Sequence, residues 1–85
     1  MWEFEYTTEF ITQSKRLDLV IKSKLKEALD ALAISENPTK LGIYKKYMGV
    51  FAYELNKSMR LIYSVRWKDH VIELIRVGDH KEAYH

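Results

Sequence analysis

A carboxylate and an arginine in the second half of the chain are the first candidates for chemistry. Glu54 and Arg60 stand on either side of residues 56–58, Asn-Lys-Ser, which have the composition of a tight turn. A three-residue turn makes Leu55 and Met59 opposite partners in a hairpin, so that Glu54 faces Arg60 on one face of a sheet. A two-residue turn places the two side chains on opposite faces, so their pairing depends on the register of the hairpin.

This pair of charges has two interpretations. An exposed ion pair of this kind adds little stability and commonly has no other role. The functional interpretation is a general base beside a phosphate-binding group, because the planar guanidinium of Arg60 presents a fork of donors that matches phosphate oxygens. Glu54 is then the candidate base and Arg60 the candidate phosphate clamp.

His80 is the candidate proton donor. It follows Gly78 and the end of an apolar segment, and a histidine can give or take a proton near neutral pH. The alternative is an exposed tail histidine without a role, and we expect none for His70 and His85. Because the three histidines lack i,i+4 or His-x-His spacing, we expect no metal site and no cofactor. The sequence also has no nucleophile elbow and no glycine-rich phosphate loop.

Length and composition bound the class of protein. The chain has 85 residues, of which 47% are hydrophobic and 13% aromatic, so we expect one packed domain spanning residues 1–85. No apolar run approaches the ~20 residues of a membrane span, and the alternating acidic start of the chain is unlike a signal peptide. The absence of cysteine excludes a disulfide framework and thiol catalysis. A cytoplasmic protein without membrane contact is therefore expected.

Positive charge is concentrated in the middle of the chain. The net charge is +2, but residues 40–65 hold five basic residues against Glu54 alone, whereas residues 1–39 hold five basic and seven acidic residues. A polyanionic partner would meet this middle stretch, although a solvated lysine-rich loop has the same composition. The candidate substrate-binding residues are Lys45, Lys46 and Lys57, together with Arg76 farther along the chain.

The pattern of apolar residues predicts the elements that position these groups. Residues 2–7 alternate as a strand, Thr8 is a plausible N-cap for a short helix, and an apolar stripe over residues 17–33, Val20 included, predicts a longer helix ended by Asn37-Pro38. After a basic linker over residues 40–48, the chain reads as three strands joined by short turns, at residues 49–55, 59–67 and 71–77. We therefore expect a two-layer α+β domain in the order β-α-α-β-β-β. Its two helices pack on one face of a small, mainly antiparallel four-stranded sheet, and the other face is open for binding.

Two segments of the second half carry a recognisable pattern. Residues 60–65 read Arg-Leu-Ile-Tyr-Ser-Val, and the apolar residues that begin at position 71 lead into Val-Gly-Asp-His-Lys-Glu-Ala-Tyr at residues 77–84. This resembles the RelE/ParE toxin superfamily, whose members show an R-[LV]-[IV]-Y strand and then an apolar strand ending in V-G-x-[HR]-[KR]-x-x-Y. Lys46 to Gly49 resemble the K-L-x-G element that precedes the second strand of that superfamily. The RelE-like branch of ribosome-dependent mRNA interferases fits better than the ParE-like gyrase poisons, because His80 and Tyr84 are retained.

The resemblance implies roles for individual residues. Arg60 matches the strand arginine that holds the scissile phosphate, and Tyr84 matches the aromatic residue that stacks on or orients the nucleotide. His80 matches a tail position that holds an arginine in some members and a catalytic histidine in others. The implied reaction is metal-free attack of a ribose 2′-OH on its phosphate, with release of a 5′-hydroxyl end. Some relatives carry two lysines where this chain has Ala52 and Glu54, so Glu54 or a lysine remains the candidate for the base.

The resemblance also implies the partners. They are a cognate antitoxin protein, the ribosome with its mRNA, and operator DNA through the antitoxin alone. Two rival functions remain open: a non-catalytic ParE-like gyrase poison, and an inactive member that acts only with its antitoxin as a repressor. The tail residues favour the enzyme, and the missing lysines favour the rivals.

Overall fold

A computed structural model describes residues 1–46 and 48–79 of the chain. The elements follow in the order β1 (Glu3–Tyr6), α1 (Thr8–Lys15), α2 (Leu19–Ile34), a 3-10 turn η1 (Pro38–Leu41), β2 (Ile43–Lys45), β3 (Val50–Glu54), β4 (Met59–Arg66) and β5 (Val71–Asp79). The strands form one sheet in the order β1-β5-β4-β3-β2. Strand β1 runs parallel to β5, and every other neighbouring pair is antiparallel.

Side-chain caps determine where the two helices begin. Thr7, rather than the predicted Thr8, caps α1: its hydroxyl accepts a hydrogen bond from the Phe10 amide at 3.0 Å and donates one to the Ile75 carbonyl. Asp18 caps α2 by accepting from the Ile21 amide at 2.9 Å. Thr7 takes the cap because its backbone is still extended from β1, whereas Thr8 is already helical.

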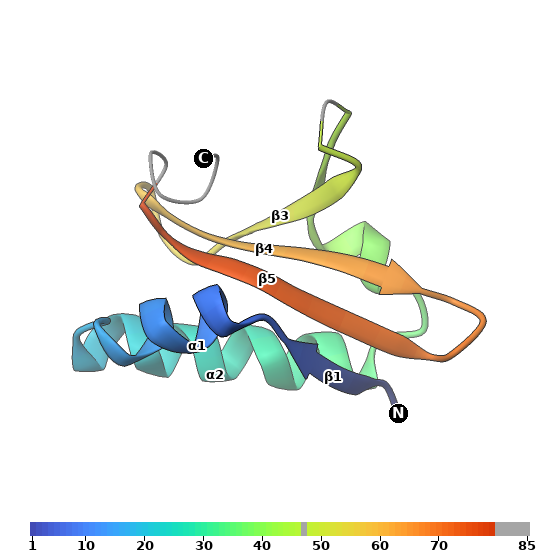
Figure 1. Cartoon of the computed structure of the whole chain (residues 1–85), viewed down its shortest axis with the longest axis horizontal. Coiled ribbons are helices and arrows are strands. Elements are labelled where there is room, and N and C mark those ends of the chain that lie inside the picture. The colour runs from blue at the N-terminus through green and yellow to red at the C-terminus, as the bar shows by residue number, and fades with distance from the viewer. Residues whose placement is uncertain (47, 80–85) are drawn as a thin grey trace.

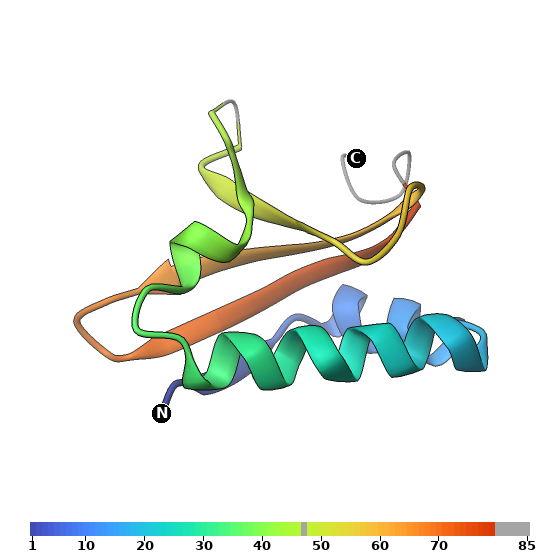
Figure 2. The same cartoon turned by 180° about the vertical axis from the view of Figure 1, so that it is seen from behind.

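Both helices pack against one face of the sheet, as predicted (Figures 1 and 2). Helix α2 ends at Ile34, three residues before the predicted stop, because the backbone of Ser35 is extended, and Pro38 begins the separate turn η1. Val20, which the apolar stripe predicts to be buried, is 66% exposed. The main core lies between the helix layer and the sheet. Its buried residues are Trp2, Phe10, Ile21, Leu25, Ala28, Leu32, Leu55, Leu61, Tyr63, Ile72, Leu74 and Val77.

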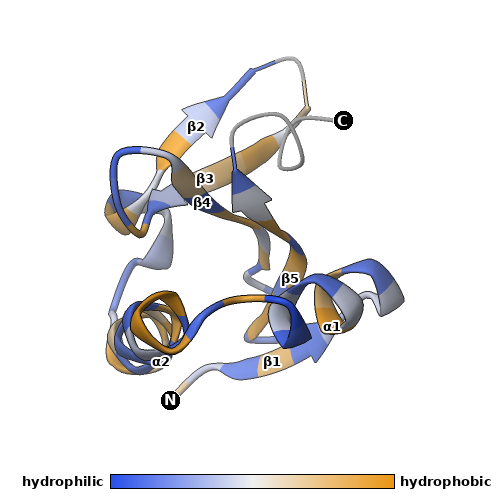
Figure 3. Cartoon of the chain, turned by 90° about the vertical axis from the view of Figure 1, so that its left-hand side faces the viewer, coloured by the Kyte–Doolittle hydropathy of each residue, from blue (hydrophilic) through white to orange (hydrophobic). Residues whose placement is uncertain are grey.

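The sheet has five strands rather than the predicted four. Part of the stretch expected to be a basic linker forms β2, which pairs with β3 so that Ile43 lies opposite Ala52 and Lys45 opposite Val50. Gly49 makes this hairpin possible: its φ of +66° is a left-handed conformation that glycine adopts at no steric cost, and its amide donates to the Lys45 carbonyl at 2.9 Å. Figure 3 shows β2 and β3 at the end of the molecule opposite the helices.

A buried tyrosine ties η1 to the sheet. The Tyr63 hydroxyl donates to the Pro38 carbonyl at 2.7 Å, and burial, with a smaller contribution from Tyr53, raises the pKa of Tyr63 well above its usual value. A Cβ on Gly42 would lie 2.6 Å from the same hydroxyl oxygen, so glycine is required there for space. Within the described residues, no helix is both long and apolar enough to span a membrane.

Candidate active site

The hairpin between β3 and β4 has the register that the three-residue turn predicts. Glu54 lies directly opposite Arg60, and the Leu55 amide donates to the Met59 carbonyl at 2.9 Å. Leu61, next to Arg60 on β4, belongs to the core beneath the helices. Because successive side chains on a strand point to opposite faces, Arg60 and Glu54 lie on the face that the helices leave open.

Arg60 is held by the backbone of its own turn. Its Nη1 donates to the carbonyls of Asn56 at 2.8 Å, Lys57 at 3.2 Å and Met59 at 3.3 Å. Its Nη2 lies 4.0 Å from Glu54 Oε2, and the side chains are 19% and 55% exposed respectively. An ion pair this long and this exposed is weak, so the carboxylate does not cancel the charge of Arg60. Neutral carbonyls fix this guanidinium in place while its positive charge remains available to an anion.

A second arginine lies next to Arg60 on the neighbouring strand. Arg76 of β5 is opposite Ile62, and Arg60 is opposite Gly78, so the two arginines are diagonal neighbours on the open face. Arg76 Nε forms an ion pair with Glu9 of α1 at 2.8 Å. Within the described part of the chain, Arg76 Nη1 is buried without a hydrogen-bond acceptor. Gly78 adds no side chain between the two arginines, and it is itself buried.

A small apolar cluster occupies the middle of the open face. Val50, Ala52 and Ile62 are buried there, and Ile75 packs against them. Beyond this cluster, Arg66 donates to Glu5. That hydrogen bond is the main reason that the pKa of Arg66 is raised. The charge of Arg66 is thus paired with a carboxylate, and the available positive charge lies at the Arg60 end of the sheet.

The four predicted substrate-binding residues separate into two groups. Lys57 lies in the β3–β4 turn and Arg76 on the strand beside Arg60. Lys45 is on the open face but opposite Val50, four residues along β3 from Glu54, which is about 13 Å at the rise of a strand. Lys46 is exposed in the turn that follows β2. The first group lies at the Arg60 site, and the second is within reach of a longer ligand that crosses the open face.

The predicted tail groups His80 and Tyr84 lie outside the described residues. Asp79, the last described residue, is opposite Met59, one register position from the pair that Arg60 forms with Gly78. The roles given to His80 and Tyr84 stay predictions. Among residues 1–46 and 48–79, no three histidine, aspartate or glutamate side chains come together as metal ligands would.

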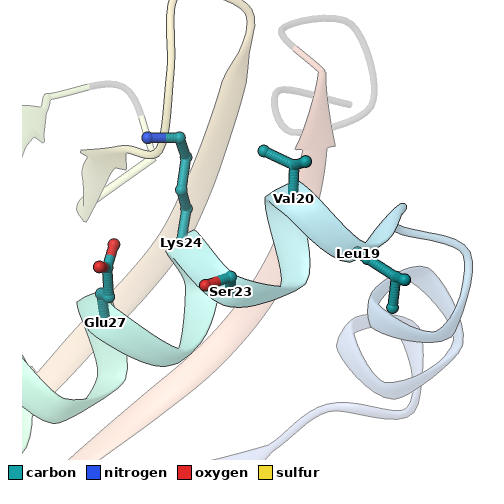
Figure 4. Close-up of a pocket in the computed structure, with 5 residues that line it drawn as sticks. All are labelled: Leu19, Val20, Ser23, Lys24 and Glu27. Carbon is teal, nitrogen blue, oxygen red and sulfur yellow. The ribbon is translucent and has the colours of Figure 1, made fainter.

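The described surface also holds a depression along α2, away from this site. Leu19, Val20, Ser23, Lys24 and Glu27 line it, and Figure 4 shows that all five project from α2. None of the residues predicted to bind or cleave a substrate belongs to it. Its apolar residues are surface positions of the helix layer, so the candidate chemistry remains on the other side of the sheet.

Comparison with known families identifies the chain. A family model described as the ParE toxin of type II toxin–antitoxin systems, parDE, matches residues 4–84. The chain belongs to this family. It is therefore a toxin of the RelE/ParE superfamily and of the type II toxin–antitoxin class, as the resemblance implied. No curated protein sequence matches it.

Solved structures of other toxins share the fold. The RelBE toxin–antitoxin complex of E. coli matches with a TM-score of 0.76 and 19% identity, over 93% of this chain and 96% of that one. The YoeB–YefM complex from Staphylococcus aureus matches with a TM-score of 0.70 and 18% identity, over 94% and 98% of the two chains. YafQ from E. coli strain BL21(DE3) matches with a TM-score of 0.71 and 18% identity over the full length of both. The expectation of a RelE-like rather than a ParE-like activity stays a prediction.

Proposed function

We propose that this toxin is a ribosome-dependent endoribonuclease that cleaves translated mRNA without a metal ion. The observation that carries the proposal is the anchored Arg60 beside Arg76 on the open sheet face. The Arg60 guanidinium, fixed by three carbonyls, suits the extra negative charge of a phosphate under attack, and Arg76, whose charge is paired with Glu9, lies on the neighbouring strand.

The proposed reaction uses the ribose next to the scissile phosphate. Its 2′-oxygen attacks phosphorus while Glu54 or a lysine takes the hydroxyl proton. The P–O5′ bond breaks, and His80 donates a proton to the departing 5′-oxygen, leaving a 2′,3′-cyclic phosphate and a 5′-hydroxyl end. Arg60 stabilises the negative charge on the phosphate oxygens, and Tyr84 orients the nucleotide.

The ribosome requirement is inferred from the exposure of the candidate base. Glu54 is more than half exposed, so the described residues do not enclose it. The alignment of the 2′-oxygen with its phosphate therefore has to come from the partner that holds the mRNA, and such alignment can supply several orders of magnitude in rate. The lysines of the middle stretch, Lys45 and Lys46 among them, would contact the surrounding RNA phosphates.

We propose a cognate antitoxin as the protein partner and the cytoplasm as the location. Two of the structures that share this fold are complexes with an antitoxin, RelB in one and YefM in the other. The antitoxin of this chain would cover the Arg60 face and would provide its contact with operator DNA.

A gyrase poison is the second candidate function. The family model that matches residues 4–84 is the ParE model, and this chain has Ala52 and Glu54 on the strand where two lysines were expected for an RNA-cleaving relative. A poison of this kind would bind gyrase and cleave nothing.

Growth and supercoiling assays separate the two functions. We expect induction of the toxin to arrest growth by halting translation, and we expect Arg60→Ala to relieve the arrest at equal protein level. Arrest that persists in Arg60→Ala, together with inhibited DNA supercoiling by purified gyrase, would overturn the proposal in favour of the poison.

A further inference from the structure

We propose that Asn56 is a positioning residue for Arg60. The side chain of Asn56 shapes the β3–β4 turn, and the carbonyls of that turn hold the guanidinium. The consequence for cleavage rests on the proposed function, whereas the positioning itself is testable in the isolated toxin.

The contacts of the Asn56 side chain define the turn. Its Oδ1 accepts hydrogen bonds from the amides of Ser58 and Met59, both at 2.8 Å, and from the Ser58 hydroxyl at 3.3 Å. An asparagine that binds the amide two residues later forms an Asx turn, which fixes the backbone without other secondary structure. The Asn56 amide also donates to the Met59 carbonyl at 3.4 Å, so this residue contacts both sides of the turn.

The orientation of one peptide group connects this turn to Arg60. In a planar trans peptide, the carbonyl and the amide hydrogen point in opposite directions. Because the Ser58 amide points at Asn56 Oδ1, the Lys57 carbonyl of the same peptide group must point away from it. That carbonyl accepts from Arg60 Nη1 at 3.2 Å, and the Asn56 carbonyl accepts from the same nitrogen at 2.8 Å. The side chain of Asn56 thus sets the direction of a carbonyl that anchors Arg60.

Anchoring matters because arginine is a long side chain with many rotamers. Ordering it only when a ligand arrives would lower affinity and misplace its donors, whereas a preformed arrangement avoids that cost. A displacement of about 1 Å at a reacting centre can lower a rate by ~10²-fold. We expect Asn56→Ala to reduce mRNA cleavage by a factor between ~10 and ~10² for this reason.

The matched variants separate positioning from simple support of the fold. Ser58→Ala removes the 3.3 Å hydroxyl contact but keeps both amide donors of the turn, so it should leave cleavage unchanged. Asn56→Asp keeps an acceptor at the same position and should retain the anchor. Asn56→Gly lacks the acceptor and suits a turn, so it replaces Asn56→Ala if that variant does not fold.

The decisive measurement is nitrogen NMR of the arginine side chains in the isolated toxin at low temperature. Anchored through Nη1 alone, Arg60 should show separate Nη1 and Nη2 signals in the parent, Ser58→Ala and Asn56→Asp, and merged signals in Asn56→Ala or Asn56→Gly. Separate signals in a variant that lacks the acceptor would overturn the proposal, whatever the toxin cleaves.

A double-mutant cycle tests whether Asn56 affects cleavage through Arg60. If Asn56 acts through Arg60, Asn56→Ala adds no further loss of cleavage in an Arg60→Ala background. Additive losses would show that Asn56 acts independently of Arg60 and would contradict the proposal. A chain in which Arg60→Ala retains full cleavage would overturn the proposed function instead, and the NMR result would still decide whether Asn56 positions the arginine.

Discussion

Two arginines on strand β4 are chemically identical and yet differ in what they can offer a ligand. Arg60 and Arg66 lie on the same sheet face, six residues apart, which is about 20 Å along the strand. Arg60 is held by three neutral carbonyls, with Glu54 at 4.0 Å. Arg66 instead donates to Glu5 and lies 3.6 Å from Asp69. A carbonyl fixes a guanidinium without cancelling its charge, whereas a carboxylate does both, so the site belongs at the Arg60 end.

Truncating each arginine in turn is the strongest test of this comparison. Arg60→Ala should lower cleavage of translated mRNA by up to ~10³-fold, because it removes a fixed charge from the phosphate in the transition state. Arg66→Ala is the matched control on the same strand, and it should leave the cleavage rate near that of the parent. Single-turnover rates on ribosomes programmed with one message give both values. Equal losses in the two variants would show that general positive charge, and not the anchored Arg60, matters.

Replacing the carboxylate beside Arg60 should have the next largest effect. Glu54→Gln keeps the shape of the side chain but cannot take a proton, so we expect a loss of ~10² in the cleavage rate if Glu54 is the base. The ratio of kcat to KM over a range of pH is the measurement. A variant as fast as the parent would return Glu54 to the role of an exposed ion-pair partner and would assign the base to a lysine.

Weakening the ion pairing of Arg66 should have the smallest effect. Glu5→Gln removes the carboxylate that contributes most to the raised pKa of Arg66, and it leaves this cation with the longer Asp69 pair at 3.6 Å. The toxin should then bind RNA a few-fold more tightly at low salt, and the slope of log K against log salt should steepen by about one. Titrations at several salt concentrations measure this. An unchanged slope would indicate that RNA does not reach the Arg66 end.

The sequence predicted much of the Arg60 site because its geometry is local. A three-residue turn determines that Glu54 faces Arg60, and period-two alternation on β4 determines which face they share. The pairing of Arg66 with Glu5 joins residues 61 apart in the chain, and no local pattern contains it. The sequence also contains a signal for the Asx turn at Asn56, because Asn-x-Ser between two strands is typical of that motif.

The wrong predictions about the fold have similarly physical causes. Strand β2 is three residues long, Ile-Tyr-Lys, which is too short for a period-two pattern to identify it as a strand. It exists because Gly49 permits a left-handed turn and because β3 offers an unpaired edge. Val20 fits the helical spacing of the apolar stripe, but like its neighbour Leu19 it lies on a side of α2 that is exposed. The early end of α2 reflects Ser35, whose extended backbone stops the helix before Pro38 can.

Primer extension on a translated message, with and without ribosomes, tests the central claim most directly. The account predicts cuts inside codons when ribosomes are present, almost none in naked RNA, loss of the cuts in Arg60→Ala and their retention in Arg66→Ala. Strong cutting of naked RNA would contradict the ribosome requirement. Absence of cutting under both conditions, with inhibited DNA supercoiling, would contradict the nuclease and identify the toxin as a gyrase poison.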